Sequence, residues 1–193
     1  YKENRKKIIN QVEQMKLVFK EFNLKTAVIK QDVEPLVEKI LQYMDEKNGG
    51  FKGAPKFPQL YIFDTIFYFY NKNKKNTFLD VVRKLLNNIS SKGIYDHLGG
   101  GISRYTVDEK WIVPHFEKML YDNILFVRTL NNYLVNQQDK KLNNKLIQTI
   151  NFIDNEFLND KNLLGSAYDA DSEGIEGKYY TWSNEEIKGL LAK

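Results

Sequence analysis

The feature that most constrains the fold of this chain is an alternation between two kinds of apolar segment. Residues 60–70 and 116–134 are apolar around almost their whole circumference, which predicts helices covered on all sides. The other apolar segments carry one stripe at three- and four-residue steps, the pattern of amphipathic helices. The alternation predicts two shells of helices, with inner and outer helices taking turns along the chain. The striped segments are residues 8–22, 33–44, 78–89 and 142–157.

Three of the connections between these helices are unusually long. They cover about residues 45–58, 92–114 and 159–183, whereas most connections in compact domains have only a few residues. Helices that alternate in direction bring every second connection to the same end, so all three are expected on one face. Most of the glycine, proline, tryptophan and histidine of the chain falls in or beside them. We therefore expect this face to carry the function.

Short motifs recur in the three long connections. They are Gly49-Gly50-Phe51, Gly100-Gly101-Ile102-Ser103 and Leu164-Gly165-Ser166-Ala167. Their spacing predicts a repeated two-helix unit of about 50 to 65 residues. Short strands are also expected there, with residues 102–105 pairing with residues 110–113.

Composition excludes several classes of protein. The chain of 193 residues has no cysteine, which excludes disulfides, thiolate metal sites and thiol nucleophiles within it. The formal net charge is only +4, and the lysines form no basic stripe of the kind found in nucleic-acid-binding proteins. No segment has the length and hydrophobicity to cross a membrane. We expect a cytoplasmic protein without a nucleic-acid partner, membrane partner, metal or cofactor.

Most candidate functional residues lie between Gly93 and Asn123. Pro114 is placed as in the first turn of a helix, which predicts that His115 begins an inner helix with Asp122 on the same face. A histidine there suits proton transfer or binding of a substrate hydroxyl, and a structural hydrogen bond is the alternative. The three glycines that follow His97 lack the spacing of a phosphate or dinucleotide loop, which favours a tight turn.

The third long connection contains a second candidate group. The sequence from Asp169 and Asp171 onward begins like a calcium-binding loop. Counted from Asp169, however, the twelfth position is Tyr180 instead of the required glutamate, which excludes an EF-hand. Two carboxylates two residues apart can act as acid and base, or they can form a solvated acidic turn. Residues 179–182 predict a further strand.

Aromatic side chains are concentrated in the same three connections. Rings combined with carboxylate, amide and guanidinium groups suit a sugar, which has an apolar face and polar edges, and ordinary packing is the alternative. We expect His115, Asp169 and Asp171 to be catalytic. The expected substrate contacts are Phe57, His97, Arg104, Tyr105, Trp111, Asp122, Tyr179 and Trp182.

Three segments carry a resemblance to a known family. They are GGFKGAPKFP (residues 49–58), GIYDHLGGGISRYTVDEKWIVPHFEKMLYDN (residues 93–123) and SAYDADSEGIEGKYYTW (residues 166–182). Their order and spacing closely resemble the thioredoxin-domain-containing family related to spermatogenesis-associated protein 20. The resemblance covers essentially the whole chain.

The resemblance implies a thioredoxin-like domain followed by a toroid similar to that of N-acylglucosamine 2-epimerases and six-hairpin glycosidases. The expected fold is all-α, the first half of an (α/α)6 toroid, with short β-hairpins in the long loops. Residues 1–22 would be a connecting helix from an upstream thioredoxin-like domain, and residues 23–193 the N-terminal half of a toroid truncated downstream. An open half-toroid exposes apolar flanks, which predicts dimerisation or aggregation of the isolated piece.

Three functional alternatives follow from the resemblance and from the residues. The leading one is a sugar-active enzyme, either a 2-epimerase or isomerase using acid–base chemistry or a glycoside hydrolase. In the related epimerases the proton-shuttling histidines lie mostly in later helices, so neither His97 nor His115 maps onto them. The second is a non-catalytic module that binds a glycan or protein and works with the thioredoxin-like domain. The third is a structural scaffold.

Overall fold

The computed structural model describes residues 4–22 and 32–192 of the chain, which divides into two compact units, Tyr1–Val33 and Glu34–Lys193. The described part of the first unit contains an amphipathic helix, α1 (Arg5–Phe22), as the apolar stripe predicts. Large apolar side chains of this stripe are exposed, among them Ile8, Val12, Met15 and Phe19.

The second unit is built from helices joined alternately by short and long connections. The helices expected from the sequence are confirmed, with two main differences in length: the helix expected over residues 33–44 ends at Leu41, and the inner helix expected from residue 116 begins at Leu120. After its last regular turn α6 continues as a short π-helix, Ile153–Phe157. The helices are α2 (Glu34–Leu41), α3 (Leu60–Asn73), α4 (Asn76–Ser91), α5 (Leu120–Asn136), α6 (Lys140–Phe152) and α7 (Asn184–Leu191).

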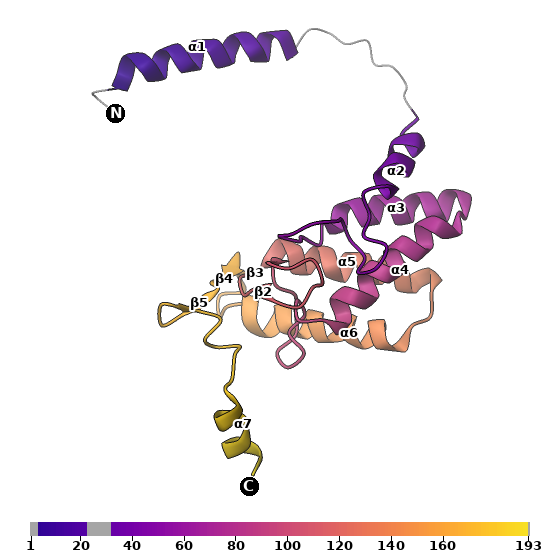
Figure 1. The fold of residues 1–193 in the computed structure, drawn as a ribbon, viewed down its shortest axis with the longest axis vertical. Coiled ribbons are helices and arrows are strands. Elements are labelled where there is room, and N and C mark those ends of the chain that lie inside the picture. Colours follow the sequence, from indigo (N-terminus) through magenta and orange to yellow (C-terminus); the bar gives the residue numbers. More distant parts are fainter. Residues whose placement is uncertain (1–3, 23–31, 193) are drawn as a thin grey trace. The chain divides into compact units, whose positions relative to one another are not determined.

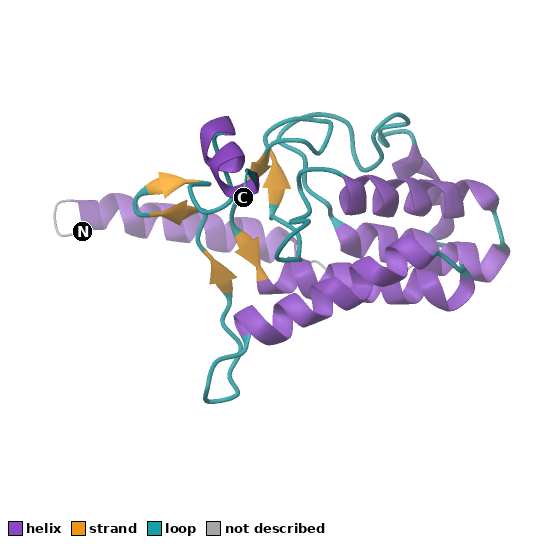
Figure 2. Cartoon of the chain, turned by 90° about the horizontal axis from the view of Figure 1, so that it is seen from below, coloured by secondary structure: helices purple, strands orange, loops and turns teal. Residues whose placement is uncertain are grey.

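Contacts between these helices confirm two layers (Figure 1). Helix α3 packs against both α4 and α5, α5 packs against α6, and α4 also contacts α6. The inner layer is therefore α3 and α5, and the outer layer includes α4 and α6. The short strands gather beside one end of these helices (Figure 2), which confirms that the long connections meet on one face.

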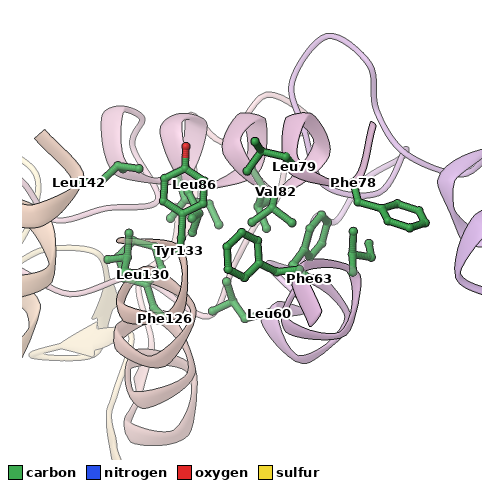
Figure 3. Close-up of a cluster of buried hydrophobic side chains, with 14 of the residues drawn as sticks. Leu60, Phe63, Phe78, Leu79, Val82, Leu86, Phe126, Leu130, Tyr133 and Leu142 are labelled. Atoms are coloured by element: carbon green, nitrogen blue, oxygen red, sulfur yellow. The ribbon is translucent and has the colours of Figure 1, made fainter. Parts of the chain in front are cut away.

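The hydrophobic core lies between the two layers (Figure 3). Phe78, Val82 and Leu86 recur every fourth residue along α4, so the helix buries one continuous stripe. Burying a side chain of this size contributes about 1.5–3 kcal/mol. Helices α3 and α5 supply the facing side chains, which are Leu60, Phe63, Phe126, Leu130 and Tyr133.

Helix α3 is not covered on all sides, although its sequence is apolar all round. Phe63 and Phe67 are buried, but Tyr61 is 60% exposed and Tyr68 is 64% exposed. Tyrosine permits this because its ring can pack while its hydroxyl group remains in water. The inner helix therefore has one open face, away from α4.

The long connections contain three two-residue strand pairs, which confirms the expected short β-hairpins. Strand β1 (Tyr105–Thr106) pairs with β2 (Pro114–His115), and Tyr105 is opposite His115. The other pairs are β3 (Lys118–Met119) with β4 (Ala167–Tyr168), and β5 (Asp171–Ser172) with β6 (Ile175–Glu176). All three pairs are antiparallel.

The first pair differs from the expected pairing of residues 102–105 with residues 110–113. The reason is the Asp108 carboxylate, which accepts hydrogen bonds from the backbone N–H groups of Lys110, Ile112 and Val113. These bonds fold residues 108–113 into a turn stabilised by the side chain, so their N–H groups do not join a strand ladder.

Two further expectations are corrected by the backbone. His115 lies in strand β2, not in the first turn of a helix, so it does not share a helical face with Asp122. Residues 179–182 form no strand: residues 177–180 make a turn, because the N–H groups of Tyr180 and Thr181 both donate to the carbonyl oxygen of Gly177.

The repeat suggested by the glycine motifs appears as the same turn in the first two long connections. The N–H of Asp45 donates to Gly50 O over 2.7 Å, and the N–H of Asp96 donates to Gly101 O over 2.9 Å. In each turn the aspartate carboxylate also accepts bonds from the backbone N–H groups two and three residues later. In the third connection Asn159 Oδ1 accepts comparable backbone bonds, so this turn has a neutral residue at its start.

A buried lysine closes each of the first two turns, and we call each lysine with its aspartate a clasp. In the first clasp Lys56 Nζ lies 2.6 Å from Asp45 Oδ2, and in the second Lys118 Nζ lies 2.7 Å from Asp96 Oδ2. Each lysine residue is only 2% exposed. The ammonium groups complete their bonding with carbonyl oxygens, Lys56 with that of Glu109 and Lys118 with that of Gly100.

Each clasp also joins one repeat to the next. The backbone of Lys56 pairs with Thr106 of the second connection, and the backbone of Lys118 pairs with Tyr168 of the third. An aromatic ring from the later repeat lies near each ammonium group: Trp111 at 5.1 Å from Lys56, and Tyr180 at 4.9 Å from Lys118. The clasps therefore position the functional face.

Replacing Lys56 by methionine should lower the free energy of unfolding by about 3–5 kcal/mol, because it leaves the Asp45 carboxylate without its buried partner. The measurement is urea unfolding followed by circular dichroism. The control is Lys75→Met, since Lys75 forms exposed ion pairs with Glu34 and Glu38, and their loss should lower the free energy of unfolding much less. Equal losses in both variants would contradict a structural role for the clasp.

Candidate functional site

Three aromatic rings form a row at the face made by the long connections. Strands β1 and β2 place Tyr105 opposite His115, and the two rings stack with centroids 4.8 Å apart and planes 17° apart. Phe57 contacts the Tyr105 ring at 4.7 Å. The expected contacts Phe57 and Tyr105 are thus brought together with His115.

His115 is held in an acid–base pair. Its Nδ1 lies 2.7 Å from Oε1 of Glu176, which strand β6 supplies. With the glutamate ionised, Nδ1 carries the proton and Nε2 is the basic nitrogen of the ring. Glu176 was not among the residues expected from the sequence, although it lies in the same acidic run as Asp169 and Asp171.

The β5–β6 hairpin links this pair to the two aspartates. Asp171 lies directly opposite Glu176 in the hairpin, so the two carboxylate side chains share one face of it. The Oδ1 atom of Asp169 accepts a hydrogen bond of 3.1 Å from the Asp171 N–H, which shapes the turn before the strand. Glu176 therefore links His115 of β2 to the hairpin that carries Asp171, and Asp169 lies in the turn before that hairpin.

Asp169 and Asp171 also line a cavity of about 380 Å³ between the second and third long connections. A neighbouring cavity of about 420 Å³ includes Trp182 and Glu186, and both cavities are lined by Tyr179 and Tyr180. Four expected residues thus meet in one region. The remaining lining of the first cavity is Asp96, Gly99, Lys118, Phe152, Glu156, Tyr168 and Ser172.

The second clasp forms one wall of the first cavity. Burial lowers the pKa of Lys118, while the hydrogen bond from Lys118 to Asp96 opposes that change. Burial, together with the nearby charge of Asp96, raises the pKa of Tyr180 to about 12. Lys118 was not expected as a site residue, because the sequence placed it on the face of a continuous helix.

Arg104 and Asp122 belong to a separate polar cluster near the start of α5. Arg104 Nη1 lies 2.9 Å from Glu117 Oε2. Burial raises the pKa of Asp122 to about 6, against the opposing effects of a Tyr121 hydrogen bond and the Arg104 charge. Arg104 Nε and Asp122 Oδ2 are both buried without a hydrogen-bond partner among the described residues. This cluster therefore retains unused hydrogen-bonding capacity.

Two expected contacts lie elsewhere. Trp111 is fully buried, and its Nε1 donates to the carbonyl oxygen of Asn48 over 2.9 Å, so its ring covers the first clasp and offers no surface to a ligand. His97 is exposed, with Nε2 3.0 Å from the carbonyl oxygen of Lys92 and Nδ1 facing Lys145. We therefore leave both residues out of the candidate site.

Within residues 4–22 and 32–192, no group of three or more histidine, aspartate and glutamate side chains is arranged to hold a metal ion. Among the same residues, no helix is long and apolar enough to cross a membrane.

Comparison with known proteins finds relatives along most of the chain. The chain is 33% identical over 166 residues to the uncharacterized protein B0495.5 of Caenorhabditis elegans. The aligned region covers 76% of this chain and 22% of that protein. It is 31% identical over 157 residues to human spermatogenesis-associated protein 20, covering 76% of this chain and 20% of the human protein. The chain thus spans about a fifth of the length of these relatives. No family model matches it.

Solved structures with the same fold are sugar epimerases. A sugar epimerase from a ruminal bacterium superposes with a TM-score of 0.60 at 18% identity, covering 75% of this chain and 42% of the epimerase. Cellobiose 2-epimerase from Spirochaeta thermophila also gives 0.60, at 16% identity, covering 72% of this chain and 41% of the enzyme. These likenesses confirm the fold class, an all-α half of an (α/α)6 toroid with short hairpins.

The raised pKa of Asp122 predicts a pH-dependent stability. Between about pH 4 and pH 6 the folded chain binds more protons at this carboxyl than the unfolded chain does, so its contribution to the free energy of unfolding falls as the pH rises. Asp122→Asn should lose this slope and gain stability relative to the parent from pH 4 to pH 7. Urea unfolding of both proteins across this pH range measures the difference in their free energies of unfolding. A difference that does not change with pH would contradict the prediction.

Proposed function

Since the chain is a homologue of spermatogenesis-associated protein 20 over 76% of its length and has the fold of half an (α/α)6 toroid, we propose that its long connections form part of a site for a sugar-like ligand. The site consists of the ring row Phe57–Tyr105–His115, the Glu176 partner of His115 and the cavity lined by Asp169 and Asp171. Rings beside carboxylates match the apolar face and hydroxyl edges of a sugar.

One observation carries the proposal: His115 is stacked on Tyr105 while its Nδ1 is paired with Glu176 at 2.7 Å. The stack and the hydrogen bond to Glu176 fix the plane of the imidazole. A fixed imidazole with Nε2 as its basic atom is suited to general acid–base catalysis.

For a 2-epimerase reaction, Nε2 would remove the proton from the carbon next to a carbonyl group. The electrons of the C–H bond then move toward the carbonyl oxygen, and a proton returned to the opposite face gives the epimer. Asp171 is our candidate for a second group, because it lies opposite Glu176 in the β5–β6 hairpin. A glycoside hydrolase would use the same carboxylates for a different purpose, protonating a glycosidic oxygen.

The domain arrangement of the whole protein is also part of the proposal. We propose that residues 23–193 are one half of a ring whose other half supplies the facing wall, and that residues 1–22 connect it to a thioredoxin-like domain. The expected cytoplasmic location and dimerisation stay predictions.

A second candidate function is a non-catalytic module that binds a glycan or a protein. The observation that favours it is the exposure of two large rings at the cavities, Tyr179 at 74% and Trp182 at 54%. Exposed rings bind sugar or peptide surfaces without needing a base.

Proton exchange distinguishes the two functions. The protein, extended until the ring closes, is incubated in heavy water with a panel of reducing sugars and N-acyl sugars, and the C2 proton is followed by NMR. Acid–base chemistry predicts loss of this signal with the appearance of a second epimer. His115→Ala should abolish the exchange while leaving the thermal midpoint nearly unchanged, because this side chain is partly exposed.

Glu176→Gln should slow the exchange, because the imidazole loses the carboxylate that orients it. The matched control is His97→Ala, which removes an exposed histidine outside the site and should leave exchange unchanged. Saturation transfer to a sugar without exchange would favour the binding module. Absence of both exchange and binding would overturn a sugar site.

A further inference from the structure

The open face of the inner helices contains a third cavity, separate from the candidate site. It has a volume of about 540 Å³ and lies along α3 and the second half of α5. None of the residues that line it belongs to the ring row, the Glu176 pair or the two aspartates. The lining consists of Tyr61, Asp64, Thr65, Phe67, Tyr68, Asn71, Arg128, Asn132, Val135 and Asn136.

Asp64 and Arg128 form an ion pair in this cavity, and their side chains differ greatly in exposure. The Asp64 side chain is 7% exposed and the Arg128 side chain is 64% exposed, with Arg128 Nε 3.0 Å from Asp64 Oδ2. Both carboxylate oxygens of Asp64 are buried and accept no hydrogen bond from the described residues. The negative charge therefore lies beneath the surface of the cavity, and the charge that a ligand can reach is the positive guanidinium.

The ion pair also orients the guanidinium. A buried carboxylate is strongly disfavoured without an opposite charge, so the ion pair keeps the Nε side of the Arg128 guanidinium next to Asp64. This contact leaves the two terminal Nη nitrogens for a ligand. Two N–H groups in a planar fork match the two oxygens of a carboxylate or phosphate group.

The remaining polar lining is uncharged and rich in hydrogen-bond donors. Asn132 lies one helical turn beyond Arg128 and Asn136 two turns beyond it, so their amide groups follow the same side of α5. Tyr61 and Tyr68 bring hydroxyl groups from the exposed side of α3. Apart from the covered Asp64, the lining includes no carboxylate that would repel an anion.

We propose that the α3–α5 cavity binds a small molecule through a carboxylate or phosphate group, with Arg128 as the anchor and the neighbouring amide and hydroxyl groups as further donors. This site does not depend on the sugar chemistry proposed for the long connections.

The test is isothermal titration of the chain with inorganic phosphate and, separately, with glucuronate, at constant ionic strength. Saturable binding of at least one is expected, and Arg128→Gln should weaken it by at least about tenfold, because a hydrogen-bonded charge pair is lost. Arg128→Lys should also weaken it, since lysine keeps the charge but lacks the fork. Phosphate binding alone or glucuronate binding alone identifies which oxyanion the site takes.

The matched control is Arg83→Gln on α4. Arg83 is also an exposed arginine whose Nε is engaged, in this case with the Tyr133 hydroxyl, and it pairs with Asp80. Its replacement should leave the affinity unchanged. The proposal is overturned if neither anion binds saturably, if Arg128→Gln binds as the parent does, or if Arg83→Gln weakens binding equally. Equal affinity for uncharged glucose would also overturn it.

Discussion

The functional face of this chain depends on two buried lysine–aspartate pairs. Each lysine takes an ammonium group out of water, at a cost that only close pairing can offset, and each is paired within 2.7 Å and bonded to a carbonyl oxygen. The pairs close glycine-rich turns, in which the same aspartates also accept backbone hydrogen bonds. Because the backbone of each lysine also pairs with the next repeat, the position of every later connection depends on the one before it.

The two pairs differ in the ring that covers them, and this difference accounts for the cavity beside the second. Trp111 lies over Lys56, is fully buried and closes the first junction with a hydrogen bond to Asn48. At the second junction the corresponding ring is Tyr180, a smaller residue that is only partly buried. Space remains beside it, and the carboxylates of Asp169 and Asp171 line that space.

The periodicity of apolar residues predicted the helices and their two layers. A helix with one apolar stripe is covered on one side, and a helix that is apolar all round is covered on most sides. The site was predicted less completely, because its geometry depends on side-chain bonds with backbone groups. Pro114 is compatible with both the start of a helix and a short strand. The turn stabilised by the Asp108 carboxylate leads into the strand β2, so the structure has the strand at this position. Lys118 and Glu176 could not be recognised as site residues without the pairing of strands that are distant in sequence.

Asn159 at the start of the third turn has a consequence for local opening of the chain. An amide has no charge to pair, so this turn is held by neutral backbone bonds, whereas the first two are also held by ion pairs. Cooperative opening begins where such bonds are fewest. Amide hydrogens around Asn159 should therefore exchange with solvent before those around Asp45 and Asp96, so that the chain loosens from the segment carrying the two aspartates while its first two repeats stay closed.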